Sequence, residues 1–67
     1  MHPTLKWFRS THLPPALQAV SKLYEDLTQQ LVGLTAEGPE LDAALRRLLE
    51  SKDAAVRARI LLMERDG

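Results

Sequence analysis

The stretch ALRRLLESKDAAVRARI, residues 44–60, decides the fold, because it reads as one helix that is apolar on more than one side. On a wheel at about 100° per residue, the surrounding segment 39–63 separates into two apolar stripes. The first stripe holds mostly small side chains, namely Leu41, Ala44, Leu48, Ser51, Ala55, Ala58 and Leu62. The second stripe holds larger ones, namely Leu45, Leu49, Val56, Ile60 and Met63. Lys52 and Arg59 lie between the stripes, about 10 Å apart along the helix.

An earlier segment carries a regular apolar seam that predicts a second long helix. Its positions recur at alternating steps of four and three and are Leu13, Leu17, Val20, Tyr24, Leu27, Leu31 and Leu34. The dipeptide Pro14-Pro15 suits a first helical turn, so this helix is expected to begin near residue 13.

Gly33, Gly38 and Pro39 mark the place where the first helix ends and the next begins, and the second helix is expected to run from about Pro39 to about Met63. Two helices of roughly 20 residues or more, joined by so short a loop, must fold back on each other. The sequence therefore predicts an all-α fold, an antiparallel two-helix hairpin over residues 12–67.

The first 11 residues, MHPTLKWFRST, have no period but contain Trp7 and Phe8, two of the three aromatic residues. We expect residues 1–11 to form an N-terminal arm that docks on another surface. Two roles are open for these aromatics. They either staple the arm onto the second apolar stripe, or one of them stacks on a nucleobase while Arg9 supplies charge. His12 is either a helix-capping group or a ligand donor.

The second stripe bears on assembly, because one partner helix can cover only one of the two stripes. A chain of 67 residues without cysteine builds a small core and has no disulfide to support it. We therefore expect a homo-oligomeric helical bundle in which the second stripe forms the subunit interface.

Lys52 and Arg59 would then lie at this interface. Three roles are open for them: their stems snorkel past aliphatic neighbours, they pair with a carboxylate of another helix such as Glu25 or Asp26, or they face an anion bound between subunits. Arg57, on the outer face, either joins the solvated surface charges or reaches a phosphate at the edge of such a site.

Several classes of function are excluded by composition. Two histidines and no cysteine argue against a metal site, and no Gly-rich loop or nucleophile–base arrangement is present, so we expect no enzyme activity and no cofactor. Nine basic residues balance nine acidic ones, which argues against a DNA- or RNA-binding protein. No apolar run approaches a membrane span and no stretch resembles a signal peptide, so a cytoplasmic protein without a membrane partner is expected.

Two strings in the chain resemble a known family. HLPPALQAVSKLYEDL at residues 12–27 and GPELDAALRRLLESKDAAVRA at residues 38–58 look like small phage proteins of actinobacterial hosts. Those proteins in turn resemble the helical-hairpin domain of phage anti-CBASS sponges. The sponge-like pattern of the second helix falls on Glu40, Ala44, Leu45, Arg47, Leu48, Glu50 and Ala55 without a gap.

The resemblance covers about residues 12–58 and implies a function. Sponges are homo-oligomers, up to hexamers, that sequester cyclic di- and oligonucleotides and so deprive host defence of its signal. By this resemblance the chain is a non-catalytic ligand trap acting in the host cytoplasm, with bases stacked on Trp7 or Phe8, phosphates held by Lys52, Arg59, Arg57 and Arg9, and a hydrogen bond from His12. Related phage sequences often carry an aromatic residue two positions before the His of HLPP, where this chain has Ser10, so Trp7 or Phe8 would have to take over the stacking role. The alternative is a helical interaction or assembly module without a small-molecule ligand.

Overall fold

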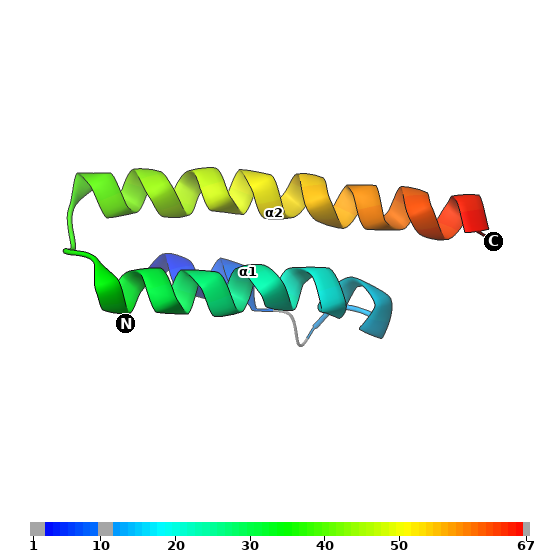
Figure 1. Ribbon diagram of the computed structural model, residues 1–67, viewed down its shortest axis with the longest axis horizontal. Helices are drawn as coiled ribbons and strands as arrows, with labels where there is room; N and C mark the ends of the chain where they lie inside the picture. The colour runs from blue at the N-terminus through cyan, green and yellow to red at the C-terminus, as the bar shows by residue number, and fades with distance from the viewer. Residues whose placement is uncertain (1–2, 10–11, 67) are drawn as a thin grey trace.

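The computed structural model describes residues 3–9 and 12–66, and these form one short 3₁₀ helix and two long α-helices without any strand. The 3₁₀ helix η1 spans Pro3–Phe8, α1 spans Pro15–Leu34 and α2 spans Pro39–Asp66. The two α-helices lie side by side and antiparallel (Figure 1). The predicted helical hairpin is confirmed, although α1 begins slightly later than expected and α2 continues past Met63.

The start of α1 is held by backbone groups and one amide side chain. The Pro14 carbonyl accepts hydrogen bonds from the backbone N–H groups of Leu17, at 2.9 Å, and Gln18, at 3.0 Å. The Gln18 side-chain amide donates to the Leu13 carbonyl. Because Pro15 is the first helical residue, its missing N–H leaves no donor unsatisfied there.

A tight connection joins the two α-helices. At the end of α1 the Thr35 hydroxyl donates to the Leu31 carbonyl at 2.7 Å, which satisfies one of the free carbonyls of the last turn. Gly38 then adopts a φ of 148°, a conformation that side chains with a Cβ rarely take. Its carbonyl accepts the Asp42 N–H at 3.0 Å and so opens α2, whose first residue is Pro39.

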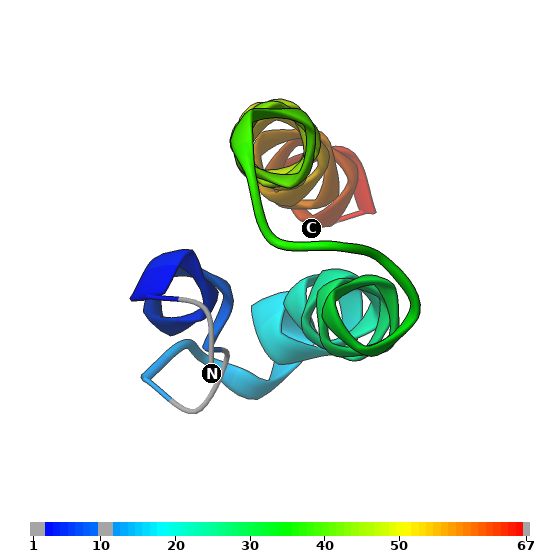
Figure 2. The ribbon, with the colours of Figure 1, turned by 90° about the vertical axis from the view of Figure 1, so that its left-hand side faces the viewer.

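The core lies where η1 meets both α-helices. Seen end on, η1 occupies the third corner of a triangle with α1 and α2 (Figure 2). The buried apolar side chains are Leu5 and Phe8 from η1 and Leu41 and Leu45 from α2. The buried polar ones, both from α1, are Ser21 and Thr28. The two α1 positions are therefore filled by small side chains, while the bulk of the core comes from η1 and α2.

The inward face of α1 differs from the predicted apolar seam. Leu27 and Leu34 belong to that seam but are 43% and 82% exposed, whereas Ser21 and Thr28 have no exposed surface. On the helix wheel the buried line is turned by roughly 70° from the seam. The reason is that α1 packs against two neighbours, α2 and η1, so its most buried line faces the space between them rather than α2 alone.

The second apolar stripe of α2 is partly covered within the chain, because η1 packs against the side of the hairpin that this stripe faces. Leu45 is fully buried, and Leu49 and Val56 are half-buried. Leu45 therefore has no surface to offer to another subunit in this conformation, which corrects its place in the predicted interface. Ile60 and Met63, which follow near the C-terminal end of α2, remain exposed.

Candidate functional site

Lys52 and Arg59 lie on the innermost line of α2. On the helix wheel they fall within about 40° of Leu41 and Leu45, the two buried leucines of this helix. The cations therefore continue the core-facing line toward the C-terminal half of the helix. The surroundings of Lys52 and Arg59 differ, because η1 ends beside Lys52.

Lys52 binds the end of η1. Its ammonium group donates to the Trp7 carbonyl at 3.1 Å and forms an ion pair with Asp53 at 3.2 Å. Its side chain is only 12% exposed. Carbonyl groups at the end of a helix have no partner within the helix, and a lysine is well suited to satisfy them. Lys52 therefore holds the arm against the hairpin, which is a structural role for this cation.

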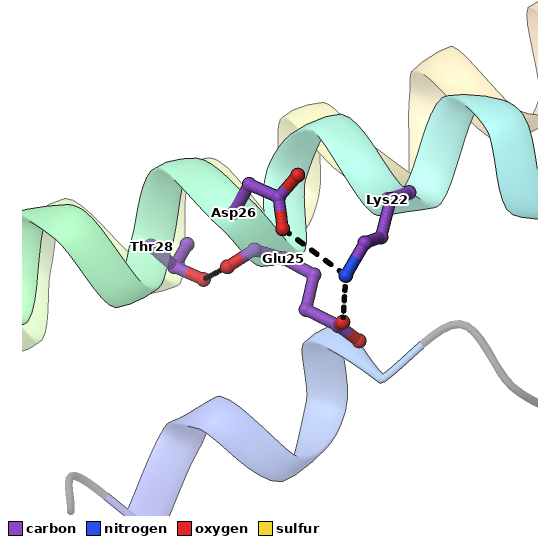
Figure 3. Close-up of polar contacts among 4 residues, drawn as sticks. All are labelled: Lys22, Glu25, Asp26 and Thr28. Atoms are coloured by element: carbon purple, nitrogen blue, oxygen red, sulfur yellow. Dashed lines mark hydrogen bonds and ion pairs between the residues drawn. The ribbon is translucent and has the colours of Figure 1, made fainter.

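The acidic residues considered as partners for the two cations, Glu25 and Asp26, form ion pairs with Lys22, another residue of α1 (Figure 3). The Lys22 ammonium lies 3.1 Å from the Glu25 carboxylate and 3.2 Å from that of Asp26. The hydrogen bond to Glu25, followed by that to Asp26, raises the pKa of Lys22. The Glu25 side chain points toward η1, and the Thr28 hydroxyl donates to the Glu25 carbonyl at 3.0 Å.

Arg59 has a different environment from Lys52. It is half-buried, and its Nε atom is buried without a hydrogen-bond partner among the residues that the structure describes. It lies about 10 Å further along α2, past the end of η1 at Phe8. A guanidinium group stays charged at any ordinary pH, so a buried donor without an acceptor costs free energy. An anion that reached this position would remove that cost.

The aromatic residues of the arm point in different directions. Phe8 is fully buried and therefore staples η1 into the core, with no ring face exposed for stacking. Trp7 is 58% exposed, and the Lys6 ammonium lies 5.2 Å from the centroid of its ring. This distance is in the range of a cation–π contact. Of the two aromatics, only Trp7 presents a surface on which a base could stack.

The remaining predicted ligand residues are exposed. Arg9 follows η1 directly, which places it on the arm side of the molecule. Arg57 lies roughly 140° from Lys52 and 160° from Arg59 around α2, so it is not brought to the same line. His12 does not cap α1, because Pro14 occupies the N-cap position and no side-chain cap hydrogen bond is formed there among the described residues. Its role as a ligand donor stays a prediction.

Two features are absent from the described residues. Within residues 3–9 and 12–66, no group of three or more His, Cys, Asp or Glu side chains could hold a metal ion. Over the same part of the chain, neither α-helix is apolar enough over a sufficient length to span a bilayer.

Comparison with family models, curated proteins and solved structures finds no match for this chain.

Proposed function

We propose that the chain is a non-catalytic phage anti-defence protein that sequesters cyclic di- or oligonucleotides between the subunits of a homo-oligomer. The resemblance of residues 12–58 to small actinobacterial phage proteins, which in turn resemble the helical-hairpin domain of phage sponges, supports this proposal. The fold is a helical hairpin, and its N-terminal arm contributes to the core through η1. Trapping of this kind requires no bond to be broken, only an anion site that excludes water.

The observation that carries the proposal is the Nε of Arg59, which is buried and has no hydrogen-bond partner within residues 3–9 and 12–66. A guanidinium group offers a rigid set of donors that matches phosphate geometry, and its hydrogen bonds to an anion are stronger when water is excluded. Ile60 and Met63, one and four residues further along α2, are exposed apolar side chains. A second subunit packed on them would close the site around Arg59.

Other residues contribute from the arm side of the molecule. Trp7 is exposed and provides a stacking surface for a base, which contributes about 1–3 kcal/mol in nucleic-acid complexes. Arg9 supplies a further positive charge, and His12 a hydrogen bond. In this proposal Lys52 acts mainly by fixing the arm, because its ammonium group already binds the Trp7 carbonyl and Asp53.

Isothermal titration calorimetry against cyclic dinucleotides, cyclic trinucleotides and their linear counterparts tests the proposal. Arg59→Ala should weaken binding by about tenfold or more, since a charged hydrogen bond contributes about 1.5–3 kcal/mol. Arg46→Ala is the matched control, because Arg46 is exposed on the outer side of the same helix and should leave affinity unchanged. Absence of heat with every cyclic nucleotide would overturn the proposal.

A second candidate function is an assembly module with no small-molecule ligand. It is favoured by exposed leucines on α1, of which Leu23 is 70% and Leu34 82% exposed. The two functions predict different results in the same titration. An assembly module associates with itself or another protein but binds neither cyclic nor linear nucleotides.

A further inference from the structure

We propose that Lys6 is a further ligand residue, and that together with Arg9 it holds the phosphate of a nucleotide whose base stacks on Trp7. This inference rests on the proposed function, because it describes how the arm takes its share of the ligand. It adds Lys6, to which neither the sequence patterns nor the resemblance assigns a role. It also places a base site and a phosphate site together on one chain.

The 3₁₀ geometry of η1 sorts its side chains into rows. A 3₁₀ helix has three residues per turn, so side chains three positions apart lie one above the other. Leu5 and Phe8 form the buried row that packs in the core. Lys6 and Arg9 form a second row, in which both residues are exposed and the Arg9 N–H donates to the Lys6 carbonyl at 3.5 Å. Trp7 lies about 120° from each of these two rows, so the arm presents two cations and one indole ring outward.

Lys6 already uses the Trp7 ring as a partner. Its ammonium group lies over the ring, 5.2 Å from the centroid. A cation–π contact at an exposed site is weak, whereas an ammonium group and a phosphate oxygen form a charge-assisted hydrogen bond. The lysine stem is flexible, so the ammonium group can exchange the ring for a phosphate. Because Trp7 is 58% exposed, its ring has surface available to the base of the same nucleotide.

The charges around the arm favour an anion. The first 24 residues contain no Asp or Glu, so no acidic side chain of the arm itself opposes a phosphate. No ion pair joins Lys6 or Arg9 to an acidic side chain among the residues that the structure describes. Glu25 points toward η1, but its carboxylate lies 3.1 Å from the Lys22 ammonium (Figure 3). The positive charges of Lys6 and Arg9 are therefore available to a ligand.

An aromatic ring beside cations binds a nucleotide through two different forces. Stacking on the ring tolerates every base, because every base has a π face, while the cations bind the phosphate. The site therefore selects for the phosphate more than for the identity of the base. We expect a nucleotide to bind more tightly than the corresponding nucleoside, and we expect binding by single chains as well as by assemblies.

A fluorescence titration tests this inference, because Trp7 is the one tryptophan of the chain and its emission reports on the stacking surface alone. The probes are adenosine monophosphate, adenosine and inorganic phosphate. Adenosine monophosphate should change the emission in a saturable manner and bind about tenfold more tightly than adenosine, whereas inorganic phosphate should leave the emission nearly unchanged.

Two variants show whether Lys6 acts through the phosphate. Lys6→Met removes the charge and keeps an unbranched stem, so it should weaken adenosine monophosphate binding by about fivefold and leave adenosine binding unchanged. Arg46→Met is the matched control, because it removes one positive charge from an exposed position on α2 and should change neither affinity. Circular dichroism should show the same helical content for both variants and the wild type.

The outcomes separate this inference from the proposed function. An emission that does not respond to adenosine monophosphate would overturn the arm site. So would a Lys6→Met variant that binds it as tightly as the wild type, or one that loses affinity for the nucleotide and the nucleoside equally. Calorimetry with cyclic nucleotides reports on the trap. If adenosine monophosphate binds through Lys6 but no cyclic nucleotide binds, the arm site stands and the trap fails.

Discussion

Replacing Phe8 with alanine should destabilise the whole chain, even though Phe8 lies in an arm outside the two long helices. Its side chain has no exposed surface, and truncating a buried phenylalanine costs about 3–5 kcal/mol. A chain of 67 residues has a total stability of about 3–10 kcal/mol. The loss is therefore a large share of the total, and Phe8→Ala should be partly or wholly unfolded at room temperature.

Urea denaturation followed by circular dichroism measures this effect, with all variants at the same protein concentration because association would also stabilise the fold. Phe8→Leu keeps most of the apolar volume and should lose less than about 1.5 kcal/mol, so it stays measurable if Phe8→Ala does not fold. Trp7→Ala is the control on the same turn. Its side chain is 58% exposed, so it should lose about 1 kcal/mol or less. A Phe8→Ala variant as stable as Trp7→Ala would refute the reasoning, because it would mean that the arm is not part of the core.

Three further predictions concern polar groups. Ser21→Ala should be neutral or stabilising by up to about 1 kcal/mol in urea denaturation, because the buried Ser21 hydroxyl has no hydrogen-bond partner among the described residues. Thr28→Val should instead lose about 1 kcal/mol, because it removes the hydrogen bond from the Thr28 hydroxyl to the Glu25 carbonyl. A loss for Ser21→Ala as large as that for Thr28→Val would contradict this. Lys52→Met should lose about 1 kcal/mol with its hydrogen bond to the Trp7 carbonyl, and Asp53→Asn should lose less because Asp53 is 52% exposed. Equal losses would argue against Lys52 as the residue that holds the arm. The pKa of Lys22 is raised in the folded chain, so the wild type should be more stable than Lys22→Gln at pH values below 10.5, the ordinary pKa of lysine. This difference in stability should disappear as the pH rises through the pKa that Lys22 has in the folded chain. A difference in stability that does not change at higher pH would show that the ion pairs of Lys22 are not its source.

The sequence was sufficient to predict the two long helices and their connection. Their apolar periodicity is strong, and Pro15, Gly38 and Pro39 each have a local backbone reason to stand where they do. Tyr24, a position of the predicted seam, faces α2, and its hydroxyl is hydrogen-bonded to that of Ser51 at 2.8 Å. Local signals of this kind depend on neighbouring residues only, so they can be read without the fold.

The sequence left two roles open for the arm, stapling onto the second stripe of α2 or stacking on a base, and the buried Phe8 fits the first of them. The bounds of η1 could not be predicted, because a 3₁₀ helix of 6 residues has no usable periodicity. For this reason the sequence could not show that the arm buries Leu45, and it predicts Leu45 in a subunit interface instead. The burial of Ser21 and Thr28 was missed for the same reason, since small polar side chains become core residues only when a third element packs over them.

Native mass spectrometry of the protein purified from cells that produce cyclic nucleotides tests the central claim most directly, because it reports subunit number and bound molecules together. The account predicts assemblies of two or more 7.5 kDa chains that retain the additional mass of a cyclic di- or oligonucleotide. Arg59→Ala should give the same assemblies without that mass. Single chains with nothing bound, from protein that is fully helical in solution, would contradict the account.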